Sequence, residues 1–285
     1  MAEHNSAAGQ RAACVIGYPA KHSRSPKLHG YWIKHYTLNA TYRAEEVAPD
    51  DAAEFIANLS NHGYVGANVT MPHKDVAFQI ATPDARAAAV EAANTLWLDN
   101  GVLRATNTDI EGFLHALDAA APGWEQRTDE VIVLGAGGAG RAIVYGFVER
   151  GIAKIHVVNR SVGKAVDLRT RFGETIVPHQ WDALPDLIGG AQVLVNTTSL
   201  GMHGSAPLDI DISMLPGTAV VCDIVYVPLK TPLLAAAEAR GLITSNGLDM
   251  LLHQAVKGFE LWFGIRPEVT QELYDLLAKD IAAAS

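Results

Sequence analysis

A glycine-rich turn between a predicted strand and a predicted helix offers the most readable chemistry in this sequence. The apolar run 131–134 leads into Gly135, Gly137 and Gly140, which have the spacing G-x-G-x-x-G. The first glycine permits a sharp turn, the second leaves room for a pyrophosphate, and the third lets the helix pack close to the sheet. The helix N-terminus then offers N–H donors to the anion. Ordinary tight turns also use such glycines, but a second strand at 154–159 favours a dinucleotide site.

The end of that second strand indicates which dinucleotide is bound. An NAD site usually has an acidic residue there, which accepts a hydrogen bond from the ribose 2′-hydroxyl. This chain has Asn159, Arg160 and Ser161 instead, and Lys164 follows one helical turn later. Two cations and a hydroxyl suit a 2′-phosphate, although charges at a helix start can also simply face solvent. We therefore expect NADP as the cofactor.

Two serines mark a candidate position for an anionic group of the substrate. Ser23 and Ser25 precede Pro26, and a serine followed by a proline is typical of a helix start. Two hydroxyls at a helix N-terminus can hold a carboxylate. In the alternative interpretation Ser25 only caps the helix and Ser23 faces solvent. The sequence alone leaves both interpretations open.

A lysine and an aspartate could supply the proton transfer that accompanies hydride transfer from a nicotinamide. Lys74 follows the predicted strand 65–69, and Asp109 begins a predicted helix two residues after Asn107. A lysine beside a carboxylate can act as an acid or a base, because a nearby charge and partial burial both shift its pKa. The alternatives are an ordinary surface lysine and an aspartate that only caps its helix.

The composition is that of a globular α/β protein, and 285 residues are enough for two domains. The net charge of −9 argues against nucleic acid or an anionic membrane as a partner. No apolar run could cross a bilayer, and residues 1–11, a polar tail, lack the apolar core of a secretion signal. Cys14 and Cys222 lie in apolar runs, and the histidines are scattered. We therefore expect a reduced, cytoplasmic protein without a metal site.

Strand-like and helical segments alternate along most of the chain. Up to residue 109, strands and helices lead to a hairpin around Asn100-Gly101, which we expect at one edge of a sheet. From 110 to 246 the βα repeats predict a parallel sheet with helices on both faces. The predicted fold class is α/β with two domains. These are a mixed-sheet substrate domain (1–109, with the helices of 247–285 packing back on it) and a Rossmann-type NADP domain (110–246).

Together these motifs resemble the shikimate dehydrogenase family, in family order and spacing from Gly17 to Pro267. The segments that carry the resemblance are Ser23-Arg-Ser-Pro, Asn68-Val-Thr-Met-Pro-His-Lys, Asn94-Thr, Asn107-Thr-Asp, Gly135-Ala-Gly-Gly-Ala, Asn159-Arg and Asp223-Ile-Val-Tyr. The resemblance implies the reversible NADP-dependent reduction of 3-dehydroshikimate to shikimate, a cyclic hydroxy acid of aromatic amino-acid biosynthesis. It leaves a monomer and a homodimer as alternatives.

The resemblance also implies a role for each site residue. Lys74 and Asp109 are the catalytic pair. The substrate carboxylate is held by Ser23, Ser25 and Tyr226, and the ring hydroxyls are met by Thr70, Asn94 and Gln254. The cofactor is held by Gly135, Ala136, Gly137, Gly138, Ala139, Asn159, Arg160, Ser161, Lys164, Gly247 and Met250.

One departure from the family pattern concerns the substrate. The family usually has G-L-G-M where this chain has Gly247-Leu-Asp249-Met250. An acidic residue beside Met250 and Gln254 could change the field of the pocket, so quinate and aminoshikimate remain alternative substrates for the same chemistry. A non-catalytic NADP(H)-binding sensor with this fold is a further alternative, which the presence of a lysine–aspartate pair disfavours.

Overall fold

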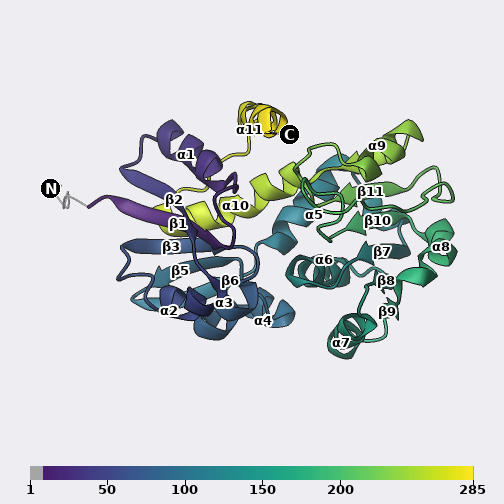
Figure 1. Ribbon diagram of the computed structural model, residues 1–285, viewed down its shortest axis with the longest axis horizontal. Coiled ribbons are helices and arrows are strands. Elements are labelled where there is room, and N and C mark those ends of the chain that lie inside the picture. The colour runs from purple at the N-terminus through teal and green to yellow at the C-terminus, as the bar shows by residue number, and fades with distance from the viewer. Residues whose placement is uncertain (1–8, 285) are drawn as a thin grey trace. The chain divides into compact units, whose positions relative to one another are not determined.

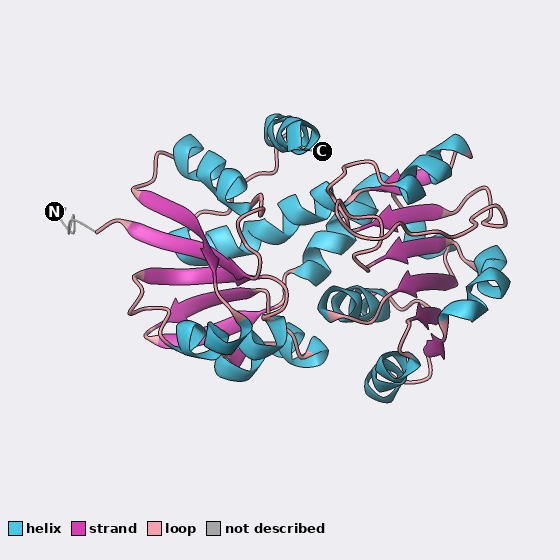
Figure 2. Cartoon of the chain, viewed as in Figure 1, coloured by secondary structure: helices cyan, strands magenta, loops and turns pink. Residues whose placement is uncertain are grey.

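The computed structural model describes residues 9–284, which form two units that each contain a six-stranded sheet (Figures 1 and 2). Of these residues, the first unit takes in the chain up to Thr108 together with Ala255–Leu273. The second takes in Asp109–Gln254 and the chain from Tyr274 onward. Most of the tail expected over residues 1–11 lies outside the described residues, and the first strand already begins at Arg11. No helix in the described part is long and apolar enough to cross a membrane.

The first sheet has the strand order β2-β1-β3-β5-β6-β4. Its strands are β1 (Arg11–Gly17), β2 (Ala40–Glu46), β3 (Tyr64–Val69), β4 (Thr82–Pro83), β5 (Thr95–Asp99) and β6 (Val102–Thr106). The helical segments between them are α1 (Ser25–His35), η1 (Pro49–Asp51), α2 (Ala52–Ala57), α3 (Lys74–Ile80) and α4 (Ala85–Val90). Strand β1 runs parallel to β2 and β3, whereas β5 is antiparallel to β3 and β6. The sheet is therefore mixed, as the sequence predicted.

Both faces of the first sheet are covered. A cluster of buried apolar side chains lies between one face and the helices α2, α3 and α4. On the other face, Trp262 of helix α10 (Gly247–Phe263) reaches β3 and donates its indole N–H to the backbone oxygen of Leu96 at 2.8 Å. A Cβ atom on Gly66 of β3 would lie only 2.0 Å from that indole nitrogen. A glycine at this position therefore allows the tryptophan to pack on the strand.

The second sheet has the strand order β12-β11-β10-β7-β8-β9, and all of its strands are parallel. They are β7 (Glu130–Leu134), β8 (Lys154–Val158), β9 (Ile176–His179), β10 (Val193–Asn196), β11 (Val220–Asp223) and β12 (Ile243–Ser245). Along the chain, successive strands are added on one side from β7 to β9 and on the opposite side from β10 to β12. Its topological switch point thus lies between β7 and β10, as in a Rossmann fold.

Helices cover both faces of the second sheet (Figure 1). The helical segments in this part are α5 (Asp109–Ala120), η2 (Trp124–Arg127), α6 (Gly138–Glu149), α7 (Val162–Phe172), η3 (Trp181–Ala183), α8 (Leu184–Leu187), η4 (Ile188–Gly190), α9 (Pro232–Ala239), the first part of α10, and most of α11 (Gln271–Ala284). Helices α8 and α9 pack on one face through a buried apolar cluster. Helices α6 and α7 contact β7, β8 and β9, whose alternate residues point to the other face.

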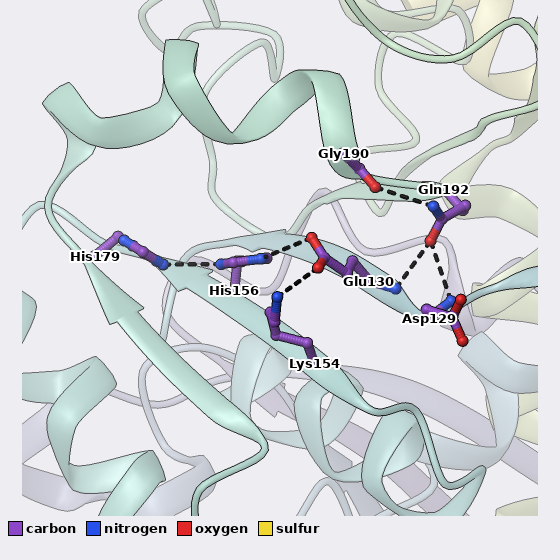
Figure 3. Close-up of polar contacts among 7 residues, drawn as sticks. All are labelled: Asp129, Glu130, Lys154, His156, His179, Gly190 and Gln192. Carbon is purple, nitrogen blue, oxygen red and sulfur yellow. Dashed lines mark hydrogen bonds and ion pairs between the residues drawn. The ribbon is translucent and has the colours of Figure 1, made fainter.

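Polar side chains link β10, β7, β8 and β9 of the second sheet (Figure 3). Gln192, just before β10, accepts two backbone N–H groups, of which that of Glu130 lies at 2.9 Å. The Glu130 carboxylate forms an ion pair with Lys154, and His156 Nε2 lies 3.4 Å from its other oxygen. His156 Nδ1 in turn lies 2.9 Å from Nε2 of His179, and burial lowers the pKa of both histidines. The two rings therefore join β8 to β9 through a hydrogen bond.

Two very short strands were not predicted. Strand β4 has two residues and β12 has three, which is too short for a recognisable pattern. Because β4 pairs with β6, the β5–β6 hairpin does not form the sheet edge that the sequence suggested. The hairpin itself is confirmed, and Asn100 and Gly101 have φ angles of 50° and 80°, as its tight turn requires.

The division of the C-terminal helices also differs from the expected domain boundaries. The first unit ends at Thr108, and of the segment 247–285 only Ala255–Leu273 groups with it. Helix α10 begins in the second unit and ends in the first. Its 17 residues span about 25 Å, so its two halves can pack on different elements. The first half packs on α5, where Gly112 meets Gln254, and the second half packs on β3.

The close approach of Trp262 gives a test of the first unit. We expect Gly66→Ala to lower the free energy of unfolding by about 2–3 kcal/mol, because the added methyl overlaps the indole ring. Gly30→Ala is the matched control: Gly30 is exposed within α1, and an added Cβ meets no atom within 4 Å. The control should stabilise the protein by about 0.5–1 kcal/mol through helix propensity. Urea unfolding measures both, and equal effects of the two substitutions would contradict this packing.

Candidate functional site

Five of the predicted site residues gather at one edge of the first sheet. Strands β1 and β3 are parallel neighbours, so the loops that follow them leave from the same edge. Ser23 and Ser25 come after β1, and Thr70 and Lys74 come after β3. Asn94 comes just before β5, which is antiparallel to β3 and so begins at that edge. The sheet topology thus brings together residues that are up to 71 positions apart in sequence.

The two loops touch where they leave the sheet. A Cβ atom on Gly17, the last residue of β1, would lie 2.4 Å from the Thr70 methyl group. The Thr70 N–H donates to the backbone oxygen of Ile16 at 2.9 Å, and the Tyr18 N–H donates to that of Met71 at 3.1 Å. The loop that carries the two serines therefore begins beside Thr70.

Ser25 is held by contacts other than helix capping. Arg24 occupies the N-cap position of α1, and no side chain caps the helix, so the capping role considered for Ser25 is wrong. The Ser25 N–H donates to Ser23 Oγ at 3.2 Å. The Ser25 side chain is buried. Ser23 and Ser25 therefore lie together at the start of α1, where the Ser23 hydroxyl accepts the Ser25 N–H.

Lys74 is fixed at the start of α3 by its neighbour. The buried His73 ring donates its Nε2–H to the backbone oxygen of Val47 at 2.7 Å. The His73 N–H donates to the backbone oxygen of Thr70 at 3.0 Å, which closes the turn between strand and helix. Lys74 itself is half-buried. The backbone beside Lys74 is therefore held both to the residue after β2 and to the residue after β3.

Asn94 connects the backbone of Lys74 with the residue before Asp109. The Ala93 N–H donates to the backbone oxygen of Lys74 at 3.0 Å. The Asn94 side-chain oxygen accepts the Thr108 N–H at 2.8 Å and the Thr108 hydroxyl at 3.1 Å. Asp109 follows Thr108 directly and is the first residue of α5. Lys74 and Thr108, the residue before Asp109, are thus held by two adjacent residues, Ala93 and Asn94.

Within the second unit, a buried carboxylate orders the loop that contains Tyr226. Asp223 at the end of β11 accepts hydrogen bonds from the side chain of Asn196 at 2.9 Å, the N–H of Val225 at 3.1 Å and the hydroxyl of Thr231 at 2.7 Å. Burial raises the pKa of Asp223 to about 6, and these hydrogen bonds oppose the rise. The motif that contains Asp223 is therefore a scaffold for the loop.

The predicted residues of α10 lie against that loop and against α5. A Cβ atom on Gly247 would lie 2.2 Å from the backbone oxygen of Ile224. On α5, a Cβ atom on Gly112 would lie 2.7 Å from both the Gln254 Cβ and the Met250 backbone oxygen. Two glycines therefore bring the first half of α10 close to the elements that carry Tyr226 and Asp109.

Asp249, the departure from the family pattern, interacts with helix α11. It is half-buried, and burial raises the pKa of its carboxyl above the ordinary value. Its negative charge contributes to raising the pKa of Tyr274, whose hydroxyl accepts a hydrogen bond from Asn246 at 3.0 Å. The charge of Asp249 therefore acts, together with burial, on Tyr274 of α11.

The glycine turn lies at the switch point of the second sheet and is shaped to hold an anion. Gly135 has a φ of +104°, and a Cβ atom there would lie 2.7 Å from Thr197 Oγ1. A Cβ atom on Gly140 would lie 2.5 Å from the backbone oxygen of Gly135. A Cβ atom on Gly137, however, meets nothing within 4 Å, and no side chain caps the helix that follows. The open space and uncapped N–H groups fit a pyrophosphate, so this part of the chain suits a bound dinucleotide.

The residues predicted for the 2′-phosphate gather at the start of α7. The Asn159 side chain accepts the Ala136 N–H at 3.2 Å and donates to the backbone oxygen of Ser161 at 2.9 Å, so it joins the two cofactor loops. Arg160 and Lys164 are exposed on either side of Ser161, and the first turn of α7 has no acidic residue. This arrangement suits an additional phosphate group.

Three residues that the motifs did not single out contribute to these positions. Tyr42 binds Asn68, Thr108 binds Asn94, and Thr197 supports the glycine turn with a hydrogen bond to the backbone oxygen of Leu134. Thr197 follows a strand at the switch point, a position from which it could have been predicted. Between residues 9 and 284, no group of three or more His, Cys, Asp or Glu side chains could hold a metal ion.

Comparisons with known proteins agree with this arrangement. Three family descriptions match the chain: shikimate dehydrogenase substrate binding domain over residues 15–96, shikimate/quinate 5-dehydrogenase over 119–203, and shikimate 5′-dehydrogenase C-terminal domain over 247–271. A shikimate dehydrogenase (NADP(+)) of Nitrobacter winogradskyi is 58% identical over 271 residues, which cover 95% of this chain and 97% of that protein.

Two solved structures are similar over nearly their whole length. Shikimate 5-dehydrogenase from Thermus thermophilus, in complex with NADP(H) and shikimate, has a TM-score of 0.84 and 30% identity, covering 95% of this chain and 99% of that one. Quinate dehydrogenase from Corynebacterium glutamicum, in complex with NAD, has a TM-score of 0.87 and 28% identity, covering 95% and 100%. The chain described here belongs to the shikimate dehydrogenase family.

Proposed function

We propose that this chain catalyses the reversible, NADP-dependent reduction of 3-dehydroshikimate to shikimate. Family membership supports the reaction class. The structural observation that carries the proposal is the hydrogen-bonded group around Asn94, which attaches the backbone of Lys74 to the residue before Asp109. Reduction of a carbonyl by hydride needs a proton donor at the developing alkoxide, and a lysine with a carboxylate can serve as one.

Lys74 and Asp109 move the proton in the proposed reaction. When bound, NADP supplies or accepts the hydride. Lys74 gives a proton to the carbonyl oxygen during reduction and takes it from the hydroxyl in the reverse direction. We expect the negative charge of Asp109 to favour the protonated lysine.

The remaining polar residues orient the ring of the substrate. Ser23 and Ser25 hold its carboxylate at the start of α1. Asn94, whose side-chain oxygen accepts two hydrogen bonds from Thr108, is assigned to a ring hydroxyl. The contacts carried over from the family in addition are Tyr226 with the carboxylate and Thr70 and Gln254 with ring hydroxyls.

The NADP assignment is supported by the second unit. The pyrophosphate is assigned to the N–H groups around Gly137 and Gly138, and the 2′-phosphate to Arg160, Ser161 and Lys164. Gly247 and Met250 are also assigned to the cofactor. Turnover measured with NADP and NAD against shikimate, quinate and aminoshikimate tests the whole proposal. A protein that oxidises quinate faster than shikimate, or that turns over none of the three, would contradict it.

The open space at Gly137 gives a first prediction. Gly137→Ala should raise the KM for NADP by about ten- to a hundredfold, because the methyl group occupies the space assigned to the pyrophosphate. Its thermal unfolding should stay near wild type, since the added Cβ meets no protein atom. Gly146→Ala on the same helix makes only ordinary contact, 3.5 Å from Leu114, and should leave the KM unchanged. Unchanged KM values in both variants would remove the pyrophosphate from this turn.

Cofactor preference gives a second prediction. Arg160→Ala should raise the KM for NADP by about ten- to a hundredfold, because a charged hydrogen bond contributes about 1.5–3 kcal/mol. The KM for NAD, which lacks the 2′-phosphate, should change little. Arg169→Ala is the control, since Arg169 lies on α7, the helix that follows Arg160, in an exposed ion pair with Glu174. Equal weakening of both cofactors by Arg160→Ala would rule out this role.

Proton transfer gives a third prediction. Lys74→Ala should lower kcat by about 10²- to 10⁴-fold, the usual contribution of general acid–base catalysis, with NADP affinity near wild type. Asp109→Asn should also lower kcat, and the double variant should lose less than the product of the two single effects. Lys154→Ala, which removes a lysine from the strand starts of the second sheet, is the control. Full kcat in Lys74→Ala would leave that lysine only a binding role.

A further inference from the structure

Two large apolar side chains are exposed on neighbouring backbone segments at the edge of the first sheet that carries the candidate site. Among the described residues of the first unit, Met71 and Tyr18 are the most exposed large hydrophobic residues, at 64% and 52%. The Tyr18 N–H donates to the backbone oxygen of Met71 at 3.1 Å, so the two residues are direct neighbours. Single exposed apolar residues are common, but adjacent ones mark a surface that contacts a ligand or a partner.

Met71 lies in the turn between two residues that are assigned to the substrate. The His73 N–H donates to the backbone oxygen of Thr70 at 3.0 Å, which closes a four-residue turn. Met71 and Pro72 are its two central residues, and the Cα atoms at the two ends of such a turn lie less than about 7 Å apart. Lys74 follows the turn directly and begins α3. A ring that reaches both Thr70 and Lys74 therefore lies over the turn that exposes Met71.

Tyr18 begins the loop that carries the two serines. It follows Gly17, the last residue of β1, where an added Cβ atom would lie 2.4 Å from the Thr70 methyl group. The loop then turns back, because the Ser23 N–H donates to the backbone oxygen of Ala20 at 3.0 Å. Along the backbone, Tyr18 thus lies between the contact with Thr70 and the turn that leads to Ser23. Both exposed apolar residues are therefore flanked by positions that are assigned to the substrate.

The polar residues of the site account for the oxygen atoms of the substrate but not for its ring carbons. Small-molecule sites combine a few polar groups with an apolar lining, because carbon surface gains free energy when it leaves water. We propose that Tyr18 and Met71 form an apolar wall of the substrate site and pack against the ring carbons of the substrate. The inference rests on the proposed function, which assigns a cyclic hydroxy acid to Ser23, Thr70 and Lys74.

Met71→Gln tests the apolar wall, because glutamine has a similar length and a polar end. We expect the KM for shikimate to rise by about five- to twentyfold, since apolar contact with the ring is lost. The effect should appear in KM rather than in kcat, because the contact is the same in the ground state and the transition state. Met71→Leu, which restores an apolar side chain, should recover most of the lost affinity. Ile80→Gln is the matched control: Ile80 is 41% exposed at the far end of α3 and should leave the KM unchanged.

Tyr18 gives an independent test of the same wall. Tyr18→Ser should raise the KM for shikimate by a similar factor, whereas Tyr18→Phe should retain most of the affinity because the ring makes the contact. Val102→Thr is the control, since Val102 is 46% exposed at the start of β6, in the β5–β6 hairpin. All the replaced side chains are exposed, so thermal unfolding should stay near wild type in every variant. A change in KM therefore reports on binding and not on folding.

Calorimetric titration with shikimate in the absence of NADP distinguishes the two proposals. Burial of apolar surface makes the heat-capacity change of binding negative, so Met71→Gln and Tyr18→Ser should both give a less negative value than wild type. If wild type binds shikimate but does not turn it over, the proposed function is wrong, and the affinity ratios still test the apolar wall. Unchanged affinity in either variant, or an equal loss in the control variants, overturns the inference. If wild type does not bind shikimate at all, both proposals are wrong.

Discussion

Close backbone approach, which only glycine permits, determines where the candidate site residues lie. Gly17 lets the serine loop begin beside Thr70, and Gly135 lets the cofactor turn pass next to Thr197. Gly247 places the start of α10 on the loop that contains Tyr226. At each of these positions a methyl group would overlap a neighbouring atom, so the loops could not keep their present course. Both units therefore use glycines at close backbone approaches, although one sheet is mixed and the other is parallel.

Buried polar side chains then fix the loops that the glycines bring together. Asp223 and Asn94 each accept three hydrogen bonds, and Asn68 makes four. Each would be costly to bury without these partners, so each selects one arrangement of its surroundings. In most of these hydrogen bonds only one of the two groups can donate. The bonds therefore also determine the direction in which each hydroxyl or amide donor points. The chemistry offered to a ligand thus depends on residues that do not reach it.

The local parts of this design could be predicted from the sequence, and the distant ones could not. Asn100-Gly101 predicted the hairpin, and the spacing of glycines after 131–134 predicted a strand, a turn and a helix in order. The resemblance to a family predicted which polar residues lie at the strand ends. The hydrogen bond between Tyr42 and Asn68 left no local pattern, because 26 positions and a change of strand separate them. Strand β12 was too short to have a period, and the division of α10 depends on tertiary packing.

The double use of Asn159 has a consequence for engineering coenzyme preference. An enzyme is commonly turned toward NAD by placing a carboxylate at the end of the second strand of the nucleotide domain, which is the position of Asn159. Here that amide donates to Ser161 and accepts from Ala136, and an aspartate could keep only the second of these bonds. The exchange would bring two acceptors together and loosen the turn that holds the pyrophosphate. Redesign is therefore better directed at the exposed side chains on either side of Ser161.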